Sequence, residues 1–313
     1  MGETKAAELD KARAGDVRAL ARLISLVEDE SPQVRSVIKD LLPDTGRARI
    51  IGLTGSPGVG KSTVTGALLS AFRAAGHRIA VLAVDPSSPF TGGALLGDRI
   101  RMQEHATDGG VFIRSMASRG HLGGLAASTP QAIRVLDAAG FDLILIETVG
   151  VGQAEVAIAS LADSVLVLLA PGMGDAIQAA KAGILEVADL FVVNKADRPD
   201  TQQVVRDLRN MIAMANLAHG AWKPPIVTTV AVKGEGIDEL VRRLDEHWSW
   251  LNATGELKKR RQARAREELT ALAFAELRGR LAASRLDELA GRVADGTLDP
   301  FTAADELLWR SAD

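Results

Sequence analysis

The chain has 313 residues, a formal net charge of −3 and no cysteine. Its length suits a core domain with extensions, and the absence of cysteine excludes disulfides and thiolate metal sites. The weak negative charge argues against a general nucleic-acid surface. Neither a membrane-spanning run nor a secretory leader pattern is present, so we expect a cytoplasmic protein that binds no membrane and no nucleic acid.

The first residues are predicted to be helical. Apolar residues recur at helical spacing over residues 6–26, with an interruption at residues 14–16, and a second helix is predicted over residues 31–42, before Pro43. We therefore expect a helical N-terminal extension over residues 1–46.

A glycine-rich loop follows the first predicted strand, residues 49–54, and precedes a predicted helix over residues 61–75. Its spacing, G-x-x-x-x-G-K-S, is that of a phosphate-binding P-loop, in which backbone N–H groups and a helix N-terminus face one anion. Lys61 is expected at the β- and γ-phosphates, Ser62 on Mg²⁺ and Thr63 nearer the α-phosphate. The predicted phosphate-binding residues are Gly55, Ser56, Pro57, Gly58, Val59, Gly60, Lys61, Ser62 and Thr63.

Carboxylates stand at the ends of two further apolar runs, Asp85 after the first and Glu147 after the second. Because the carboxyl ends of parallel strands meet at one edge of a sheet, both are expected beside the phosphates as Mg²⁺ groups. Glu147 takes the place of a Walker-B aspartate, and the N–H of Gly150 is expected at the γ-phosphate. Asp98, in a loop rich in Gly, Ser and Pro, is a further candidate. Helix capping is the alternative role for these carboxylates.

A guanine-reading motif, N-K-x-D, follows a later apolar run. The carboxylate of Asp197 can accept hydrogen bonds from N1–H and the exocyclic amine of guanine, a donor pair that adenine lacks. Lys195 can cover the base plane, and Asn194 can brace the loop. After the next predicted strand, Ala231 and Val232 can present backbone N–H groups to the guanine O6. The two motifs together predict a GTP-binding domain.

The order of elements predicts the fold. Residues 47–252 alternate predicted strands and helices through some seven units, which indicates an α/β P-loop NTPase with a mostly parallel, doubly wound sheet. Residues 253–313 contain only helix formers, so we expect a helical C-terminal arm. This arm carries the large apolar residues Leu269, Leu272, Phe274, Leu277, Leu281 and Leu286. Either the core or a second copy must cover them, and we favour a dimerisation arm.

One loop has an open interpretation. Residues 171–175 read Pro-Gly-Met-Gly-Asp, follow a predicted strand and lead to a predicted helix that carries Lys181. This composition suits recognition by a partner protein, and an ordinary strand-to-helix turn explains it equally well.

With its motifs in this order, the chain resembles the MeaB family of GTPases, formerly named ArgK, in the G3E group of the SIMIBI class. This family contains the bacterial relatives of the human methylmalonic aciduria type A protein. The resemblance is carried by residues 55–63, 85–89, 147–153 and 194–197, and most specifically by residues 113–124.

The resemblance implies a homodimeric, Mg²⁺-dependent GTPase that acts as a chaperone of an adenosylcobalamin-dependent acyl-CoA mutase, chiefly methylmalonyl-CoA mutase. GTP binding and hydrolysis would control loading, protection and reactivation of the cofactor. It also implies Mg²⁺-associated carboxylates at Asp85, Asp98 and Glu147, and a signal-transmitting segment over residues 171–185 with Lys181. The candidate catalytic residues are Lys61, Asp98, Glu147 and Lys181.

Two alternative functions share parts of this sequence pattern. A metal-delivery GTPase of the same group would hold nickel through Cys and His, and this chain has no cysteine. A small-molecule kinase could use the same P-loop, although the N-K-x-D motif and the lack of an evident acceptor pocket count against it. The motifs contain no established water-orienting residue, and Gln153 is the one candidate for that role. We therefore expect slow GTP hydrolysis that a partner accelerates.

Overall fold

The computed structural model describes residues 3–29, 31, 33–85, 108–117, 128–148, 158–172, 187–215, 220–280 and 283–309. The chain divides into two compact units, residues 1–257 and residues 258–313. None of the described helices is both long and apolar enough to cross a bilayer.

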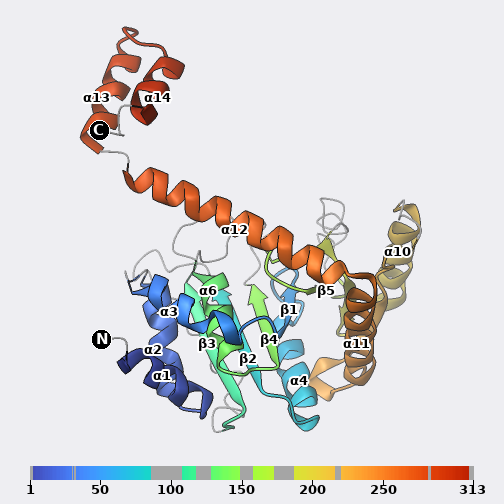
Figure 1. Ribbon diagram of the computed structural model, residues 1–313. Coiled ribbons are helices and arrows are strands. Elements are labelled where there is room, and N and C mark those ends of the chain that lie inside the picture. The colour runs from blue at the N-terminus through green and yellow to red at the C-terminus, as the bar shows by residue number, and fades with distance from the viewer. Residues whose placement is uncertain are drawn as a thin grey trace. The chain divides into compact units, whose positions relative to one another are not determined.

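The first unit is built on a seven-stranded sheet of order β3-β2-β4-β1-β5-β6-β7 (Figure 1). The strands are β1 (Arg49–Thr54), β2 (Ile79–Asp85), β3 (Val111–Ala117), β4 (Leu143–Thr148), β5 (Ser164–Leu169), β6 (Leu190–Asn194) and β7 (Ile226–Thr229). All the pairings between these strands are parallel. The expected parallel sheet is confirmed, and residues 111–117, for which no strand was predicted, form its edge strand β3.

Helices cover both faces of this sheet. They are α1 (Glu3–Arg13), α2 (Val17–Glu28), α3 (Val34–Leu41), α4 (Lys61–Ala74), α6 (Thr129–Ala138), α10 (Thr201–Met214) and α11 (Ile237–Thr254), with short 3₁₀ helices η1 (Leu42–Asp44) and η4 (Ala231–Lys233). Ile50 of β1 packs into the core shared with α1–α3, α6 and α10, whereas Ile51 packs into the core shared with α4 and α11. Burial on both faces explains why the strands read as continuous apolar runs.

The N-terminal extension is helical and packs on the sheet. Leu20, Leu23 and Ile24 of α2 are buried in the same core as the strands, and each contributes about 1.5–3 kcal/mol by leaving water. The predicted interruption is the boundary between α1 and α2, where the Asp16 carboxylate caps α2 by accepting the N–H groups of residues 18 and 19 at 2.9 and 3.0 Å. The second predicted helix is shorter than expected and continues as η1 through Pro43, which the first turn of a helix tolerates.

Arg114 of β3 ties this extension to the sheet. Its Nη2 donates to Ser25 Oγ at 3.0 Å and pairs with the carboxylate of Glu28, both on α2. Arg114 belongs to the family-specific run over residues 113–124. Residues 113–117 of this run lie in β3, and residues 118–124 lie outside the described residues.

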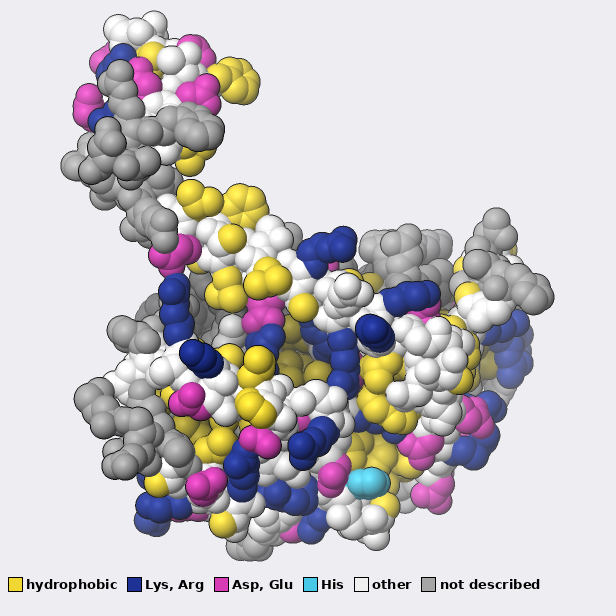
Figure 2. Space-filling model, viewed as in Figure 1, with side chains coloured by type: hydrophobic (Ala, Val, Ile, Leu, Met, Phe, Trp, Pro, Cys, Tyr) yellow, Lys and Arg dark blue, Asp and Glu magenta, His cyan; other side chains and the backbone are white. Residues whose placement is uncertain are grey.

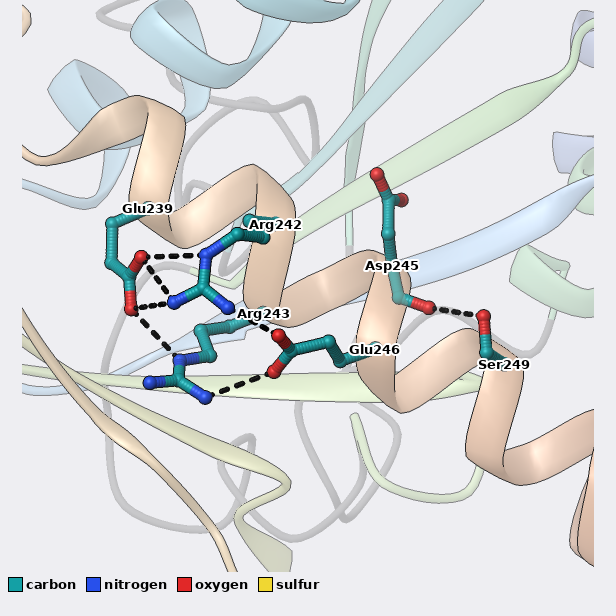
Figure 3. A network of polar contacts seen from close by, with 6 residues as sticks. All are labelled: Glu239, Arg242, Arg243, Asp245, Glu246 and Ser249. Atoms are coloured by element: carbon teal, nitrogen blue, oxygen red, sulfur yellow. Dashed lines mark hydrogen bonds and ion pairs between the residues drawn. The ribbon is translucent and has the colours of Figure 1, made fainter.

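Helix α11 presents two kinds of charged contact. Glu239, Arg242, Arg243 and Glu246 pair with one another along its surface, while the Asp245 carboxylate points away from them (Figure 3). Asp245 instead accepts Arg49 Nη1 at 2.6 Å. Exposed pairs of the first kind contribute little to stability, whereas Asp245 connects α11 to the first residue of β1.

The C-terminal residues are helical, as expected. Helix α12 (Glu256–Arg280) begins at the unit boundary and is followed by α13 (Ala283–Ala294) and α14 (Pro300–Trp309). Leu289 and Ala303 are buried where α13 packs on α14, and Arg292 pairs with Glu306 at 3.4 Å.

Candidate nucleotide site

The loop between β1 and α4 is shaped by glycines that no other residue could replace without strain. Gly55 has φ 141°, and a Cβ there would lie 2.3 Å from the carbonyl oxygen of Leu168. Gly60 has φ 97°, and a Cβ there would lie 2.4 Å from the side-chain amide of Asn194. The neighbouring strands β5 and β6 therefore approach the loop closely, and the loop has the backbone form that P-loops use to cradle phosphate.

Lys61 is the first residue of α4, and its ammonium lies over this loop. Nζ donates to the carbonyl oxygens of Gly55 at 2.6 Å and Ser56 at 3.2 Å. The side chain is largely buried, with 8% of the residue exposed. A phosphate held in the loop would lie within reach of this cation, which is the role expected of Lys61.

Glu147 of β4 brings a carboxylate to the same helix. It lies level with Leu53 of β1 in the sheet register, and only 1% of the residue is exposed. Ser62 Oγ donates to Oε1 at 2.6 Å, and Thr65 Oγ1 donates to Oε2 at 2.9 Å. A hydroxyl beside a carboxylate is a pair of hard oxygen donors, which fits Mg²⁺.

Thr65 was not among the predicted site residues. The available signal was its spacing, because Thr65 follows Ser62 by three residues and so lies on the same face of α4. That spacing places Ser62 and Thr65 on one face of α4, but it does not indicate which strand packs against that face.

Asn194, at the end of β6, joins the phosphate end to the base end. Its Nδ2 donates to the carbonyl oxygen of Val59 at 2.9 Å. Its Oδ1 accepts the hydroxyl of Thr229 at 3.1 Å and the N–H of Ala231 at 3.2 Å. Because the residue is 3% exposed, these bonds are made away from water and hold the P-loop and η4 in one arrangement.

The rest of the N-K-x-D motif is more open. Lys195 has φ 57°, and its Nζ donates to the carbonyl oxygen of Gly58 at 2.6 Å. Asp197 is exposed, as is Val232, of which 79% is accessible. Since the N–H of Ala231 is committed to Asn194, Val232 is the better placed of the two expected donors to a base.

Several expected site residues lie outside the described residues, namely Asp98, Gly150, Gln153 and Lys181. Asp85 ends β2 and pairs with Ala117, but its side chain also lies outside that set. Of the loop over residues 171–185, only Pro171 and Gly172 are described. Within the described ranges, no three His, Asp or Glu side chains form a metal-binding cluster. Mg²⁺ sites that rely on phosphate oxygens need only one or two carboxylates.

Comparisons with known proteins extend this picture over the chain. The family model described as Methylmalonyl Co-A mutase-associated GTPase MeaB matches residues 20–285. A relative from Pyrococcus abyssi is 46% identical over 306 residues, 96% of this chain and 94% of that protein. The GTPase ArgK of Escherichia coli is 38% identical over 274 residues, 85% of this chain and 82% of that protein.

A mitochondrial relative and a solved structure support the same family. The methylmalonic aciduria type A homolog, mitochondrial, of Mus musculus is 37% identical over 268 residues, 79% of this chain and 64% of that protein. A crystal structure of an LAO/AO transport system kinase matches with a TM-score of 0.74 at 28% identity, covering 97% of this chain and 96% of that one. With the P-loop and N-K-x-D geometry, these matches show that the chain belongs to the MeaB family and is a guanine-nucleotide-binding GTP hydrolase.

Proposed function

We propose that this GTPase is a chaperone of an adenosylcobalamin-dependent acyl-CoA mutase, methylmalonyl-CoA mutase or a relative. The observation that carries the proposal is the family match over residues 20–285, to a GTPase named for its association with that mutase. The match includes most of α2 and all of α3 and α12, which lie outside the P-loop and the N-K-x-D motif. In this proposal, GTP binding and hydrolysis control cofactor loading, protection and reactivation.

The P-loop holds the phosphates of GTP in this proposal. Backbone N–H groups of the loop, which Pro57 lacks, surround the β-phosphate in this proposal, and Lys61 moves from its carbonyl partners to the phosphate oxygens. Ser62 would be a ligand of Mg²⁺ and Glu147 would hold it through a water molecule, with Asp85 and Asp98 as further carboxylates of the site. Mg²⁺ supplies neutralisation of the charge on the β- and γ-phosphate oxygens.

The base end selects guanine. Asp197 accepts N1–H and the exocyclic amine, the Val232 N–H donates to O6, and Lys195 covers the base. Asn194 positions both ends, because one side chain bonds the P-loop and η4. An adenine nucleotide would leave the Asp197 carboxylate without donors, so weak binding of adenine nucleotides is expected.

Hydrolysis is slow without a partner. Water attacks in line with the leaving oxygen, and Lys61 and the loop N–H groups stabilise the transferred charge. Among the described residues, we assign none to the orientation of this water. We propose that mutase binding completes the site through residues 171–185, including Lys181.

The protein acts as a homodimer in this proposal, with α12 as the contact. Leu269, Leu272 and Phe274 of α12 are 68%, 53% and 64% exposed, and hydrophobic side chains are visible along this helix in Figure 2. Their spacing distributes them around much of the helix rather than along a narrow stripe. A second copy of the chain would cover them, and light scattering would give twice the mass of one chain.

Co-purification with each candidate mutase, in GTP and in GDP, tests the proposed function. Association that changes with the nucleotide, together with faster GTP turnover in the complex, is the expected result. No association in either state, or equal turnover with and without the mutase, would contradict it. That result would leave the prediction of guanine-specific binding by the isolated protein unchanged, because the family and the site support it independently.

A further inference from the structure

The second oxygen of Glu147 is held by a residue that no P-loop motif requires. Ser62 holds Oε1, and Thr65 holds Oε2 at 2.9 Å. Thr65 has no exposed surface, and Glu147 is 1% exposed. We propose that Thr65 is a positioning residue of the magnesium site, which fixes the plane of the Glu147 carboxylate so that Oε1 faces Ser62 and the metal. This inference rests on the proposed Mg²⁺ role of Ser62 and Glu147.

A carboxylate needs two contacts to be fixed in its plane. The terminal torsion of a Glu side chain has a broad energy profile, so a bond to one oxygen leaves rotation about the last carbon–carbon bond. Hydroxyl donors on both oxygens, from two residues of α4, remove that freedom. In a site that excludes water, each of these charge-assisted bonds is strong.

Thr65 would act on the metal through Glu147. A hydroxyl has one hydrogen and two lone pairs, so Ser62 could donate to Oε1 and also direct a lone pair at Mg²⁺. Thr65 is not a metal ligand in this arrangement and can keep its bond to Oε2. Glu147 would therefore hold its orientation while its neighbour becomes a ligand.

The helix in turn fixes Thr65. Its Oγ1 also lies 3.0 Å from the carbonyl oxygen of Lys61, one turn earlier in α4. The single hydroxyl hydrogen of Thr65 has two acceptors within reach, this carbonyl and the Glu147 carboxylate, and the charged carboxylate is the stronger of the two. The position of Thr65 is thus set by the same first turn that carries Lys61 and Ser62.

Thr65→Val removes the hydroxyl and keeps the shape. We expect the dissociation constant of Mg²⁺ from the GDP complex to rise about tenfold, as is typical when a group that orients a metal ligand is lost. The affinity for GDP measured in EDTA should not change. Mg²⁺ titrations of protein with a bound fluorescent GDP analogue give the first quantity, and titrations of the analogue in EDTA give the second. Thr65→Ser keeps a hydroxyl at this position, so its Mg²⁺ affinity should be that of the wild type.

Thr229→Val is the matched control. Thr229 is equally buried, and its hydroxyl holds Asn194 at the base end. This variant should weaken GDP binding alike with and without Mg²⁺. An unchanged Mg²⁺ affinity in Thr65→Val, or a loss of GDP affinity that EDTA does not alter, would overturn the proposal. If Mg²⁺ had no effect on wild-type protein, the proposed metal site would fall and this inference with it, whereas guanine binding would stand.

Discussion

The two ends of the sheet use carboxylates in different ways. At the amino end, acidic residues that directly precede a strand accept a backbone N–H at the start of the neighbouring strand. Asp142 accepts that of Arg78 at 2.7 Å, Asp163 that of Ile50 at 3.1 Å, and Asp189 that of Val165 at 2.9 Å. These contacts connect β4 to β2, β5 to β1 and β6 to β5. They hold the strands in register.

At the carboxyl end, Glu147 accepts two hydroxyl groups instead. A backbone N–H has its direction set by the fold, whereas a hydroxyl can rotate and offer its lone pairs elsewhere. We therefore propose different roles for the two sets. The carboxylates held by backbone donors are structural, and Glu147, held by hydroxyl donors beside the P-loop, would serve the metal.

A serine, a histidine and an aspartate also lie together at the amino end of the sheet, but their burial excludes a catalytic role. Ser164 Oγ lies 2.8 Å from Nδ1 of His247, and Asp189 Oδ1 lies 3.3 Å from its Nε2, which are the residue types of a hydrolase triad. Ser164 and His247 have no exposed surface, and His247 stacks on Trp250. No substrate can reach the serine, so this set anchors α11 to the sheet.

The largest effect is expected from Asp197→Asn. The amide cannot accept from both N1–H and the amine of guanine as the carboxylate does, so GDP affinity should fall on the order of 100- to 1000-fold. The melting temperature without nucleotide should not change, because Asp197 is exposed. Titration with GDP and with XDP checks this, since xanthine carries a carbonyl group where guanine carries its amine. XDP binding that is tighter in the variant than in the wild type supports the assignment, and unchanged GDP binding contradicts it.

Asp163→Ala should lower the stability of the protein and leave its GDP affinity unchanged, which is the opposite of Asp197→Asn. It leaves the buried N–H of Ile50 without its acceptor, which costs about 3 kcal/mol of unfolding free energy. GDP affinity of the folded protein should remain that of the wild type. Urea unfolding and GDP titration of the same preparation measure both quantities. A large loss of GDP affinity at unchanged stability would break the distinction between the two ends.

Glu147→Gln tests the carboxyl end without removing the side chain. The amide keeps one acceptor but loses the charge, so Mg²⁺-dependent GTP hydrolysis should fall about 10- to 100-fold. The matched variant Asp163→Asn removes the same charge at the amino end and should keep its hydrolysis rate. Equal rates for both variants would show that Glu147 has no special part in the metal site.

The smallest effect concerns Asp16, a carboxylate held by backbone donors but exposed. The N–H of Ala19 is the chief cause that holds the pKa of Asp16 below its ordinary value of 3.8. A lowered folded-state pKa stabilises the protein above the unfolded-state pKa, and this contribution is lost as the pH falls through the folded-state pKa. Asp16→Ala should therefore melt earlier than wild type at pH 7, with a gap that narrows below about pH 4. A gap independent of pH would contradict the capping role of the charge.

The sequence predicted those parts of the fold whose signal is local. The strands β1, β4 and β6 are apolar runs that end at polar motifs, and the P-loop spacing locates the first turn of α4. The edge strand β3 had no such signal, because Arg114 interrupts its apolar run and finds its partners on α2. Thr65 looks like an ordinary helical threonine until β4 places Glu147 against it, 82 residues away in sequence. Contacts of this range depend on strand order, which local patterns do not contain.

A crystal structure with GDP and Mn²⁺, with anomalous scattering at the manganese edge, tests the distinction between the two ends most directly. We predict a metal peak about 2.1 Å from Ser62 Oγ, with Glu147 no more than one water away and Thr65 still bonded to its second oxygen. The carboxylates of Asp142, Asp163 and Asp189 should keep their backbone partners and hold no metal. A peak at the amino end, or GDP bound with Mn²⁺ remote from Ser62 and Glu147, would contradict the account.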